Sequence, residues 1–341
     1  MTSLPRPRRG RPTLEMVAEL AGVSRGTASR VLSGATNVSD QAVESVRRAA
    51  AELHYRPNLS ARSLVTGRTG LVGLLVNEPQ HKLWTDPFFG QIARGAHDRL
   101  AAAGVALVLS LATDEDERDR IIELASTRLD GVLVIRGAGD RTLVDTLVAT
   151  GVPLVTAGRP QPPIDERVGW VDSQNLEGAR DAVAHLLSTG RRRIAIISGP
   201  LDMAVSADRI DGWRAALESA GLDHDDSLLA QGGFTVESGE DAMHALLDRG
   251  SGIDGVFASN DLMAMGALHA LRDAGRRVPD DIAVVGFDDI VAATAEPALT
   301  TMAQDVSGFG ATMATLLLEQ LGGAEPRHVR MPTTLVVRDS A

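Results

Sequence analysis

The chain has 341 residues, enough for two or three domains with cores of their own, and its 44% hydrophobic and 23% charged residues are an ordinary globular composition. It contains no cysteine, which excludes disulfides and thiolate metal sites, and its eight histidines show no zinc-ligand spacing. The sequence has no apolar run of membrane-spanning length and no apolar stretch behind its basic start that would make a signal peptide, so we expect a cytoplasmic protein without a cofactor.

Charge is distributed unevenly along the chain. Residues 1–68 hold eleven arginines and five acidic residues, a net charge of +6, whereas the whole chain carries −11. The remaining residues therefore carry −17. Such an asymmetry suggests a nucleic-acid-binding head on an acidic body, and the alternative is a basic tail that has no partner.

The stretch VAELAGVSRGTASRVLSG, residues 17–34, predicts two short helices joined by a tight turn. Thr13 can cap a first helix from Leu14 to about Ala21, and Gly22 can end it. Ser24 can then cap the second helix. Two short helices joined by a short turn that contains glycine describe a helix-turn-helix.

The second of these helices has two contrasting faces. Its apolar face is formed by Ala28, Val31 and Leu32. Its polar face carries Arg25, Gly26, Ser29 and Arg30. A third helix, capped by Ser39, would complete a small core with Val43, Val46, Ala50 and Leu53. The basic outer face favours a DNA-binding head over an ordinary helical hairpin.

Beyond the head, short apolar runs of strand length alternate with helical patterns. The runs are Leu71–Val76, Val105–Leu109, Val132–Ile135, Val152–Val155, Ile194–Ile197, Val256–Ala258 and Ile282–Val285. Continuous apolar strands that alternate with helices are typical of parallel sheets covered on both faces. The strands are too many for one modest sheet, so we expect an α/β body with two lobes.

Side chains suited to a sugar follow several of these runs. Acidic, amide and guanidinium groups hydrogen-bond vicinal hydroxyls, and aromatic faces pack on the apolar side of a sugar ring. Because ligands of open α/β sheets bind at the carboxyl ends of strands, the candidates are Trp84, Asp86, Phe88, Phe89, Asp172, Arg209, Asn260 and Asp288. Three other side chains have structural interpretations: Asp261 as a helix cap, Asp289 as solvent-facing and Trp213 as core. The loop 77–87 is long, and Trp84 on it would extend the pocket for a ligand larger than one ring.

Two motifs resemble those of a known family. The pattern T-x-x-x-V-A-x-x-A-G-V-S-x-x-T-x-S-R-V-L is matched from Thr13 to Leu32, and the hinge pattern Y-x-P-N-x-x-A-R-x-L from Tyr55 to Leu64. Residues 13–76 are thus similar to the DNA-binding head and hinge of the lac-repressor (LacI–GalR) family of transcription regulators.

The resemblance implies a fold and a set of boundaries. A basic arm at 1–12, a helix-turn-helix domain at 13–57 and a hinge helix with its linker at 58–68 would precede a two-lobed core at 69–341 that resembles a type I periplasmic sugar-binding protein. The N-lobe would hold about 69–172 and 301–325, and the C-lobe about 173–300 and 326–338. The chain would then cross between the lobes near residues 172, 300 and 325.

The resemblance also implies partners and site residues. A homodimer would bind double-stranded operator DNA through Arg25, Gly26, Thr27, Ser29, Arg30, Asn58, Ala61, Arg62 and Leu64. Of these, Arg25 and Arg30 would approach bases in the major groove, and paired Leu64 side chains would wedge into the minor groove. The family pattern supports Arg209, Asn260 and Asp288 as ligand contacts and adds Phe234 as an aromatic platform. Met203 stands where purine-responsive members have arginine, which disfavours a purine.

These patterns together predict a repressor of carbohydrate-use genes that a small sugar or oligosaccharide releases or modulates. Closure of the two lobes on the ligand would shift the paired hinges, which is an allosteric bias rather than chemistry. We do not expect an enzyme, because no nucleophile–base pair, phosphate loop or metal cluster is apparent in the sequence. The alternative is a soluble sugar-binding or transport-type protein, against which the hinge motif and the lack of a signal peptide argue.

Overall fold

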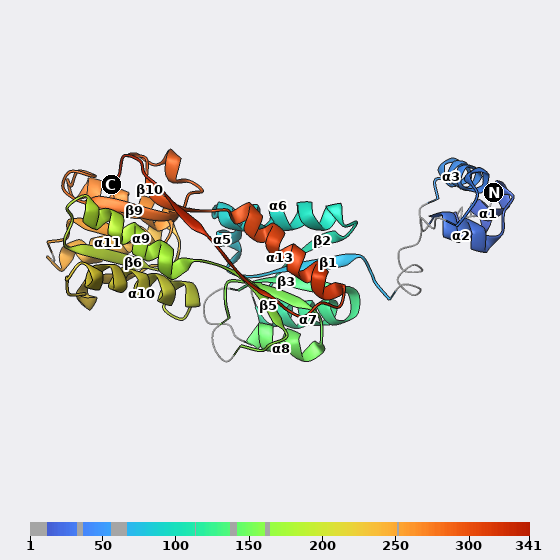
Figure 1. Ribbon diagram of the computed structural model, residues 1–341, viewed down its shortest axis with the longest axis horizontal. Coiled ribbons are helices and arrows are strands. Elements are labelled where there is room, and N and C mark those ends of the chain that lie inside the picture. The colour runs from blue at the N-terminus through green and yellow to red at the C-terminus, as the bar shows by residue number, and fades with distance from the viewer. Residues whose placement is uncertain are drawn as a thin grey trace, which may run out of the picture. The chain divides into compact units, whose positions relative to one another are not determined.

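The computed structural model describes residues 12–32, 37–55, 67–112, 114–136, 142–160, 164–250 and 252–341. It divides between Thr69 and Gly70 into two compact units, a small head and a large core, which are described separately (Figure 1). This boundary lies within one residue of the one that we expected. Within the described ranges, no helix is long and apolar enough to cross a membrane.

The head consists of three helices, α1 (Leu14–Ala21), α2 (Arg25–Leu32) and α3 (Asp40–Glu52). The hydroxyls of Thr13 and Ser39 cap α1 and α3, and Ser24 accepts the Thr27 amide at 3.1 Å at the start of α2. Gly22 ends α1 in the left-handed conformation, at φ 67°. The head core buries Val17, Ala18, Ala28, Val31, Val46 and Ala49. The predicted helix-turn-helix is therefore confirmed, including its caps.

Each lobe of the core is built on a six-stranded sheet. The N-lobe sheet has the order β11-β5-β4-β3-β1-β2 and is parallel throughout. Its strands are β1 (Leu71–Asn77), β2 (Ala106–Leu111), β3 (Gly131–Arg136), β4 (Leu154–Ala157), β5 (Val168–Ser173) and β11 (His328–Met331). The C-lobe sheet has the order β12-β10-β9-β8-β6-β7, with β12 antiparallel to β10. Its strands are β6 (Ile194–Ser198), β7 (Leu229–Gln231), β8 (Gly255–Ala258), β9 (Ala283–Asp288), β10 (Thr300–Gln304) and β12 (Thr333–Val336).

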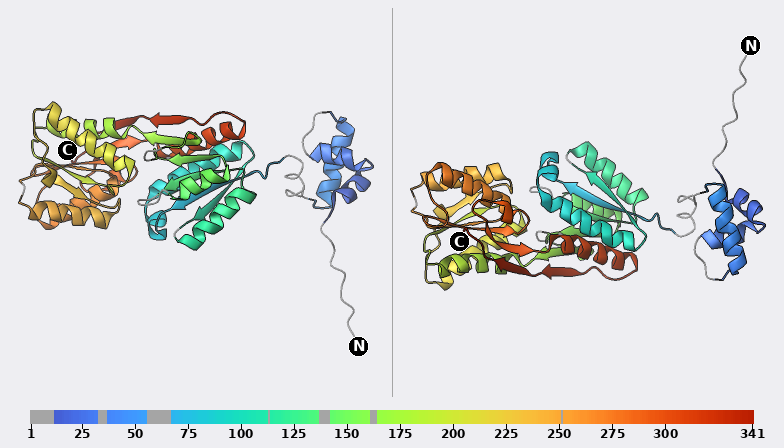
Figure 2. Two further views of the ribbon diagram at one scale, coloured as in Figure 1. Left: turned by 90° about the horizontal axis from the view of Figure 1, so that it is seen from below. Right: turned by 90° about the horizontal axis from the view of Figure 1, so that it is seen from above.

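Helices cover both faces of each sheet, as Figure 2 shows for the two lobes. The N-lobe helices are α5 (Gln80–Thr85), α6 (Pro87–Ala102), α7 (Glu115–Arg128), α8 (Thr142–Thr150) and α13 (Val306–Leu321). The C-lobe helices are α9 (Asn175–Ser188), α10 (Ala204–Ser219), α11 (Val236–Asp248) and α12 (Asp261–Asp273), with short 3-10 turns at Asp226–Leu228 and Ala292–Thr294. Trp213 is fully buried in the C-lobe core, as predicted. The two-lobed α/β fold is thus confirmed.

The chain crosses between the lobes three times, the first time near the expected residue 172 and the other two times further along the chain than we expected. Crossings lie at Gln174 between β5 and α9, at Asp305 between β10 and α13, and at Pro332 between β11 and β12. The assignment of 301–304 to the N-lobe was wrong, because β10 pairs with β9. The assignment of 326–331 to the C-lobe was also wrong, because β11 pairs with β5. Apolar pattern identifies a strand, but it does not say which sheet the strand joins.

Candidate functional site

A cavity of about 140 Å³ lies between the lobes, at the carboxyl ends of strands from both sheets. Its polar lining consists of Glu78, Lys82, Asp86, Arg159, Asp172, Ser173, Asn175, Arg209, Asn260, Asp288 and Gln304. Its aromatic lining consists of Phe88, Phe89, Phe234 and Phe309. The cavity therefore joins hydrogen-bonding groups to ring faces, which is the combination that binds a polyhydroxylated ring.

All the ligand residues that the sequence predicted line this cavity, with one exception. Trp84 does not line it, and its side chain is 72% exposed. The expectation that Trp84 extends the pocket is therefore wrong. Residues 80–85 form the short helix α5, which turns Lys82 toward the cavity and leaves Trp84 on its outer surface.

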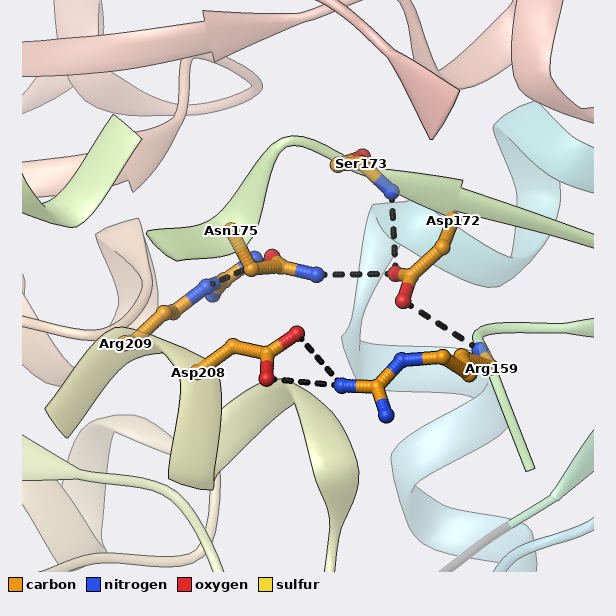
Figure 3. Close-up of polar contacts among 6 residues, drawn as sticks. All are labelled: Arg159, Asp172, Ser173, Asn175, Asp208 and Arg209. Atoms are coloured by element: carbon orange, nitrogen blue, oxygen red, sulfur yellow. Dashed lines mark hydrogen bonds and ion pairs between the residues drawn. The ribbon is translucent and has the colours of Figure 1, made fainter. Parts of the chain in front are cut away.

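Arg209 is buried and lies at one end of the polar network drawn in Figure 3. Its Nε donates to Asn175 Oδ1 at 3.0 Å, and its Nη1 donates to the carbonyl of Ser259. Its guanidinium also stacks over the Phe287 ring, 3.6 Å from the centroid. Burial lowers the pKa of Arg209, whereas the carboxylates of Asp288 and Asp172 oppose that shift. These contacts hold the guanidinium in one orientation at the cavity wall.

Asp172 is the next-to-last residue of β5 and lies beside Asn175 in this network. One carboxylate oxygen accepts Asn175 Nδ2 at 2.8 Å and the Ser173 amide at 2.9 Å, and the other accepts the Arg159 amide at 3.3 Å (Figure 3). Burial raises the pKa of Asp172. Asn175 thus connects Asp172 to Arg209, a role that the sequence did not indicate.

Asp288 ends β9 with a backbone φ of 115°, in a region that L-residues rarely adopt. Its Oδ1 accepts Gln304 Nε2 at 2.6 Å, and burial raises its pKa well above the ordinary value. Its neighbour Asp289 does not simply face solvent, as we had expected, because it pairs with Arg338 at 2.7 Å. A strained residue that is held at a cavity wall is a common mark of a functional position.

The roles of Asn260 and Asp261 differ from those that the sequence suggested. Asn260 caps α12 by accepting the Met263 amide at 2.9 Å, and it also lines the cavity and donates to the Phe234 carbonyl at 3.2 Å. Asp261 is buried and instead accepts Thr301 Oγ1 at 2.6 Å. The interpretation of Asp261 as a cap was therefore wrong. Asn260 combines the cap and the cavity contact.

The N-lobe wall carries a second set of charges. Asp86 caps α6 by accepting the Phe88 amide at 2.9 Å, and burial raises its pKa to about 6. Glu78 and Lys82 form an ion pair at 3.3 Å, with side chains that are 10% and 21% exposed. Glu78, Lys82 and Arg159 were not predicted from the sequence, although Glu78 directly follows β1 and Arg159 lies two residues after β4.

The head presents the expected polar face on α2. Arg25, Gly26, Ser29 and Arg30 are exposed, and Thr27 is half-buried. Arg25 Nε pairs with Glu15 of α1 at 2.7 Å, and Arg30 Nε donates to the Gly26 carbonyl at 3.3 Å. The hinge residues that we expected at DNA, Asn58, Ala61, Arg62 and Leu64, lie outside the described residues.

Comparison with known families and proteins agrees with both units. A family model described as bacterial regulatory proteins, lacI family, matches residues 13–58, and one for a periplasmic binding protein-like domain matches residues 183–341. The HTH-type transcriptional regulator CelR of Thermobifida fusca is 46% identical over 98% of this chain and 99% of its own length. The ribose operon repressor of Escherichia coli (strain K12) is 33% identical over 96% of this chain and 98% of its own.

Two solved structures of transcriptional regulators match this chain over 97% of its length. The lac repressor dimer bound to operator and an anti-inducer, ONPF, has a TM-score of 0.83 at 29% identity, covering 97% of this chain and 99% of that one. A complex of the transcriptional regulator CelR with cellobiose has a TM-score of 0.77 at 43% identity, covering 97% of this chain and 100% of that one.

A helix-turn-helix head followed by a periplasmic-binding-protein-like core defines a DNA-binding transcriptional regulator. The chain belongs to the lacI family of bacterial regulatory proteins. Its curated relatives are regulators, so the expectation that it is not an enzyme is confirmed, and the transport-type alternative is set aside.

Proposed function

We propose that this protein is a cytoplasmic, homodimeric repressor of carbohydrate-use genes, controlled by a small sugar or oligosaccharide in the interlobe cavity. The observation that carries the proposal is the cavity lining, which combines Asp172, Arg209 and Asp288 with the Phe88 and Phe89 rings. Its polar groups would bind hydroxyls, and its ring faces would cover the apolar side of a sugar.

Individual residues have distinct parts in this proposal. Arg209 donates to ligand oxygens, because its remaining N–H groups are held in place by the Asn175 and Ser259 bonds. Asp172 and Asp288 accept from ligand hydroxyls, and Phe234 packs on a ring face. The Phe234 ring packs directly on Gly199. A Cβ at Gly199 would overlap the ring, so this position needs glycine to leave room for the aromatic side chain.

Two comparisons guide the choice of ligand. CelR, which is 43% identical to this chain over the aligned structure, was solved with cellobiose, and this supports a glucose disaccharide as the first sugar to test. Met203 lines the cavity in place of the arginine of purine-responsive members, which argues against a purine.

The head would read the operator through α2. Arg25 and Arg30 are exposed on its outer face, and a Cβ at Gly26 would meet nothing closer than Ser24 Oγ at 3.8 Å, so DNA backbone can approach closely there. A dimer would place two such helices on a palindromic site. Lobe closure around a sugar would change how the two heads are presented, which couples the cavity to the DNA.

A thermal-shift panel tests the sugar assignment. Cellobiose, D-glucose, D-ribose and hypoxanthine are each added to the full-length protein and to an Asp288→Asn variant. We expect a sugar to raise the melting temperature of the wild type and to leave that of the variant unchanged. At 100 times its Kd, a bound ligand stabilises the folded protein by about 2.7 kcal/mol. Stabilisation by hypoxanthine and by none of the sugars would overturn the proposal.

A further inference from the structure

Two arginines lie on the exposed outer face of α2, and each is held through its Nε atom. Arg25 is the first residue of the helix, and its Nε lies 2.7 Å from Oε1 of Glu15 on α1. The Nε of Arg30 donates to the Gly26 carbonyl at 3.3 Å. The two contacts differ in charge, because Glu15 brings a carboxylate to the surface that would face DNA and the Gly26 carbonyl does not.

The Glu15 carboxylate is held at the start of α1. Hydrogen bonds from the backbone amide of Glu15 and from the Thr13 hydroxyl lower the pKa of this carboxyl, and the charge of Arg25 lowers it further. The carboxylate is therefore ionised at neutral pH. The side chains of Arg25 and Glu15 are 72% and 60% exposed, so the pair adds little to the stability of the head. What the pair fixes is the direction of the guanidinium.

The contact leaves the end of the Arg25 side chain for DNA. A guanidinium has five N–H donors, one on Nε and two on each Nη. The two Nη groups form no hydrogen bond with the head residues that the structure describes. An end-on bidentate contact to guanine uses one N–H of each Nη, with O6 and N7 as acceptors. A carboxylate at Nε is compatible with that contact and restricts rotation of the guanidinium.

A second exposed ion pair of the head has the other arrangement. Arg48 and Glu44 lie one turn apart on α3 and meet through Nη2, at 3.0 Å. The carboxylate there occupies the end of the guanidinium, and the two side chains are 72% and 75% exposed. This pair lies outside the predicted recognition helix, so it provides a matched control for the pair on α1 and α2.

A carboxylate beside Arg25 also opposes non-specific binding. Arginine and lysine bind DNA of any sequence by neutralising phosphates. In a helix-turn-helix the first helix crosses the DNA backbone, and the N-terminal residues of the second contact base edges. Glu15, in the first turn of α1, would therefore repel phosphates and compete with them for the Arg25 guanidinium. Arg25 would then bind strongly only where a guanine is within reach.

We propose that Glu15 is a specificity-determining residue that acts through Arg25, directing its guanidinium toward a guanine and away from phosphates. The inference rests on the proposed reading of the operator by α2 and adds to it a residue of α1. Glu15 is a positioning residue in this account, because Arg25 touches the base and Glu15 does not. The carboxylate lowers the affinity for DNA in general and raises the selectivity for one sequence.

Binding selection from a random DNA library tests the inference on the full-length protein. The variants are Glu15→Gln, Arg25→Ala and the double variant that combines them, and the matched control is Glu44→Gln. We expect Arg25→Ala and Glu15→Gln to relax the preference for guanine at the same position, by at least about fivefold. Glu15→Gln changes no preference when Arg25→Ala is already present, and Glu44→Gln changes none in the wild type.

The two single variants should differ on DNA of unrelated sequence, measured by anisotropy over a range of salt concentrations. Glu15→Gln releases Arg25 to a phosphate, so the affinity for such DNA rises and the slope of log affinity against log salt steepens by about one. Arg25→Ala lowers that affinity. A purely structural role of Glu15 would instead weaken binding to all DNA. Melting temperatures report folding, and if Glu15→Gln does not fold, Glu15→Ala decides.

The outcomes separate this inference from the proposed function. Unchanged base preferences in Arg25→Ala would contradict the proposed role of Arg25 and this inference with it. If Arg25→Ala relaxes one position and Glu15→Gln relaxes none, Arg25 reads a base and the positioning role of Glu15 is overturned. An effect of Glu15→Gln at a different position, or one that persists in the double variant, also overturns it, because Glu15 would then read a base itself.

Discussion

The guanidinium of Arg159 meets the carboxylate of Asp208 across the cleft, with Nη2 2.7 Å and 2.9 Å from the two oxygens (Figure 3). Arg159 follows β4 in the N-lobe, and Asp208 lies on α10 in the C-lobe. Their side chains are only 23% and 22% exposed. Each also adjoins the cavity, because the Arg159 amide donates to Asp172 and Asp208 directly precedes Arg209. The pair therefore joins the lobes at the residues that would touch a ligand.

Breaking this interlobe pair should weaken ligand binding without unfolding the protein. A half-buried ion pair contributes roughly 1 kcal/mol, so Arg159→Met or Asp208→Asn should lower the cellobiose affinity about fivefold. When the salt concentration is raised from 50 mM to 500 mM, the cellobiose affinity of the wild type should decrease, and that of the variants should change less. Calorimetry at the two salt concentrations measures both effects.

A charge reversal provides the control for that prediction. The double variant Arg159→Asp with Asp208→Arg should recover part of the affinity that either single reversal loses, because the attraction across the cleft is restored. Identical affinities in the wild type and in all single variants would mean that the lobes close without help from the pair.

The affinity for a sugar should depend on pH through Asp86. Burial raises the pKa of this carboxyl to about 6 from 3.8. A ligand hydroxyl that donates to the ionised carboxylate favours the deprotonated form, so binding releases a proton and the affinity rises with pH up to about 6, then levels off. Calorimetric titrations from pH 5 to pH 8 measure the slope.

Asp172 and Asp288 face the same cavity and also have raised pKa values. The contribution of Asp86 is therefore the part of the slope that Asp86→Asn removes. A variant with the same pH profile as the wild type would show that Asp86 acts only as the cap of α6.

Most of the fold follows from local sequence signals. Thr13, Gly22 and Ser39 mark helix ends through short-range hydrogen bonds and backbone conformation, and such signals do not depend on the rest of the chain. The apolar runs in β1 and β9 also identify strands from local sequence alone. The short or less apolar strands β5, β7, β10, β11 and β12 carried no comparable signal, and we did not predict them.

The candidate site was predictable where it follows strand ends. Asn260 and Asp288 were found because parallel strands bring their carboxyl ends to one edge. The Arg159–Asp208 pair was not, because it joins residues 49 positions apart in two different lobes. Trp84 was misplaced because the six-residue helix α5 is too short to show helical periodicity, so the sequence did not say which side chains face inward.

The contact between α6 and α13 should depend on glycine. A Cβ on Gly95 would overlap the backbone carbonyl of Ser307, so Gly95→Ala should force the helices apart and lower the free energy of unfolding by about 1–3 kcal/mol. Gly90 lies on the same helix with open space around its Cβ position, and Gly90→Ala should stabilise by up to about 1 kcal/mol. Denaturant unfolding compares the two. Equal effects would show that α6 and α13 can separate at no cost.

Base recognition should depend on α2. Arg30→Ala should cost about 1–3 kcal/mol in operator binding and relax the preference at one base position, as expected for a bidentate contact to guanine. Arg25→Ala should act in the same way at another position, because its pairing with Glu15 holds the guanidinium in one direction. Binding selection from a random DNA library measures the preference at each position.

An arginine on another helix is the matched control. Arg48 of α3 is also exposed and pairs with Glu44 at 3.0 Å, so Arg48→Ala should leave the base preferences unchanged. If Arg25→Ala or Arg30→Ala weakens binding to all sequences uniformly, that arginine contacts phosphate and does not read a base.

The central claim is that a sugar in the interlobe cavity controls DNA binding. Its most direct test uses a DNA fragment that the protein itself has selected from a random library. The wild type and Asp288→Asn are each titrated into this fragment at fixed salt, with and without saturating cellobiose, and binding is followed by fluorescence anisotropy. We predict that cellobiose changes the DNA affinity of the wild type at least about tenfold, a coupling of about 1.4 kcal/mol, and that Asp288→Asn binds the fragment normally without responding. An unchanged DNA affinity when the cavity is filled with sugar would contradict the account.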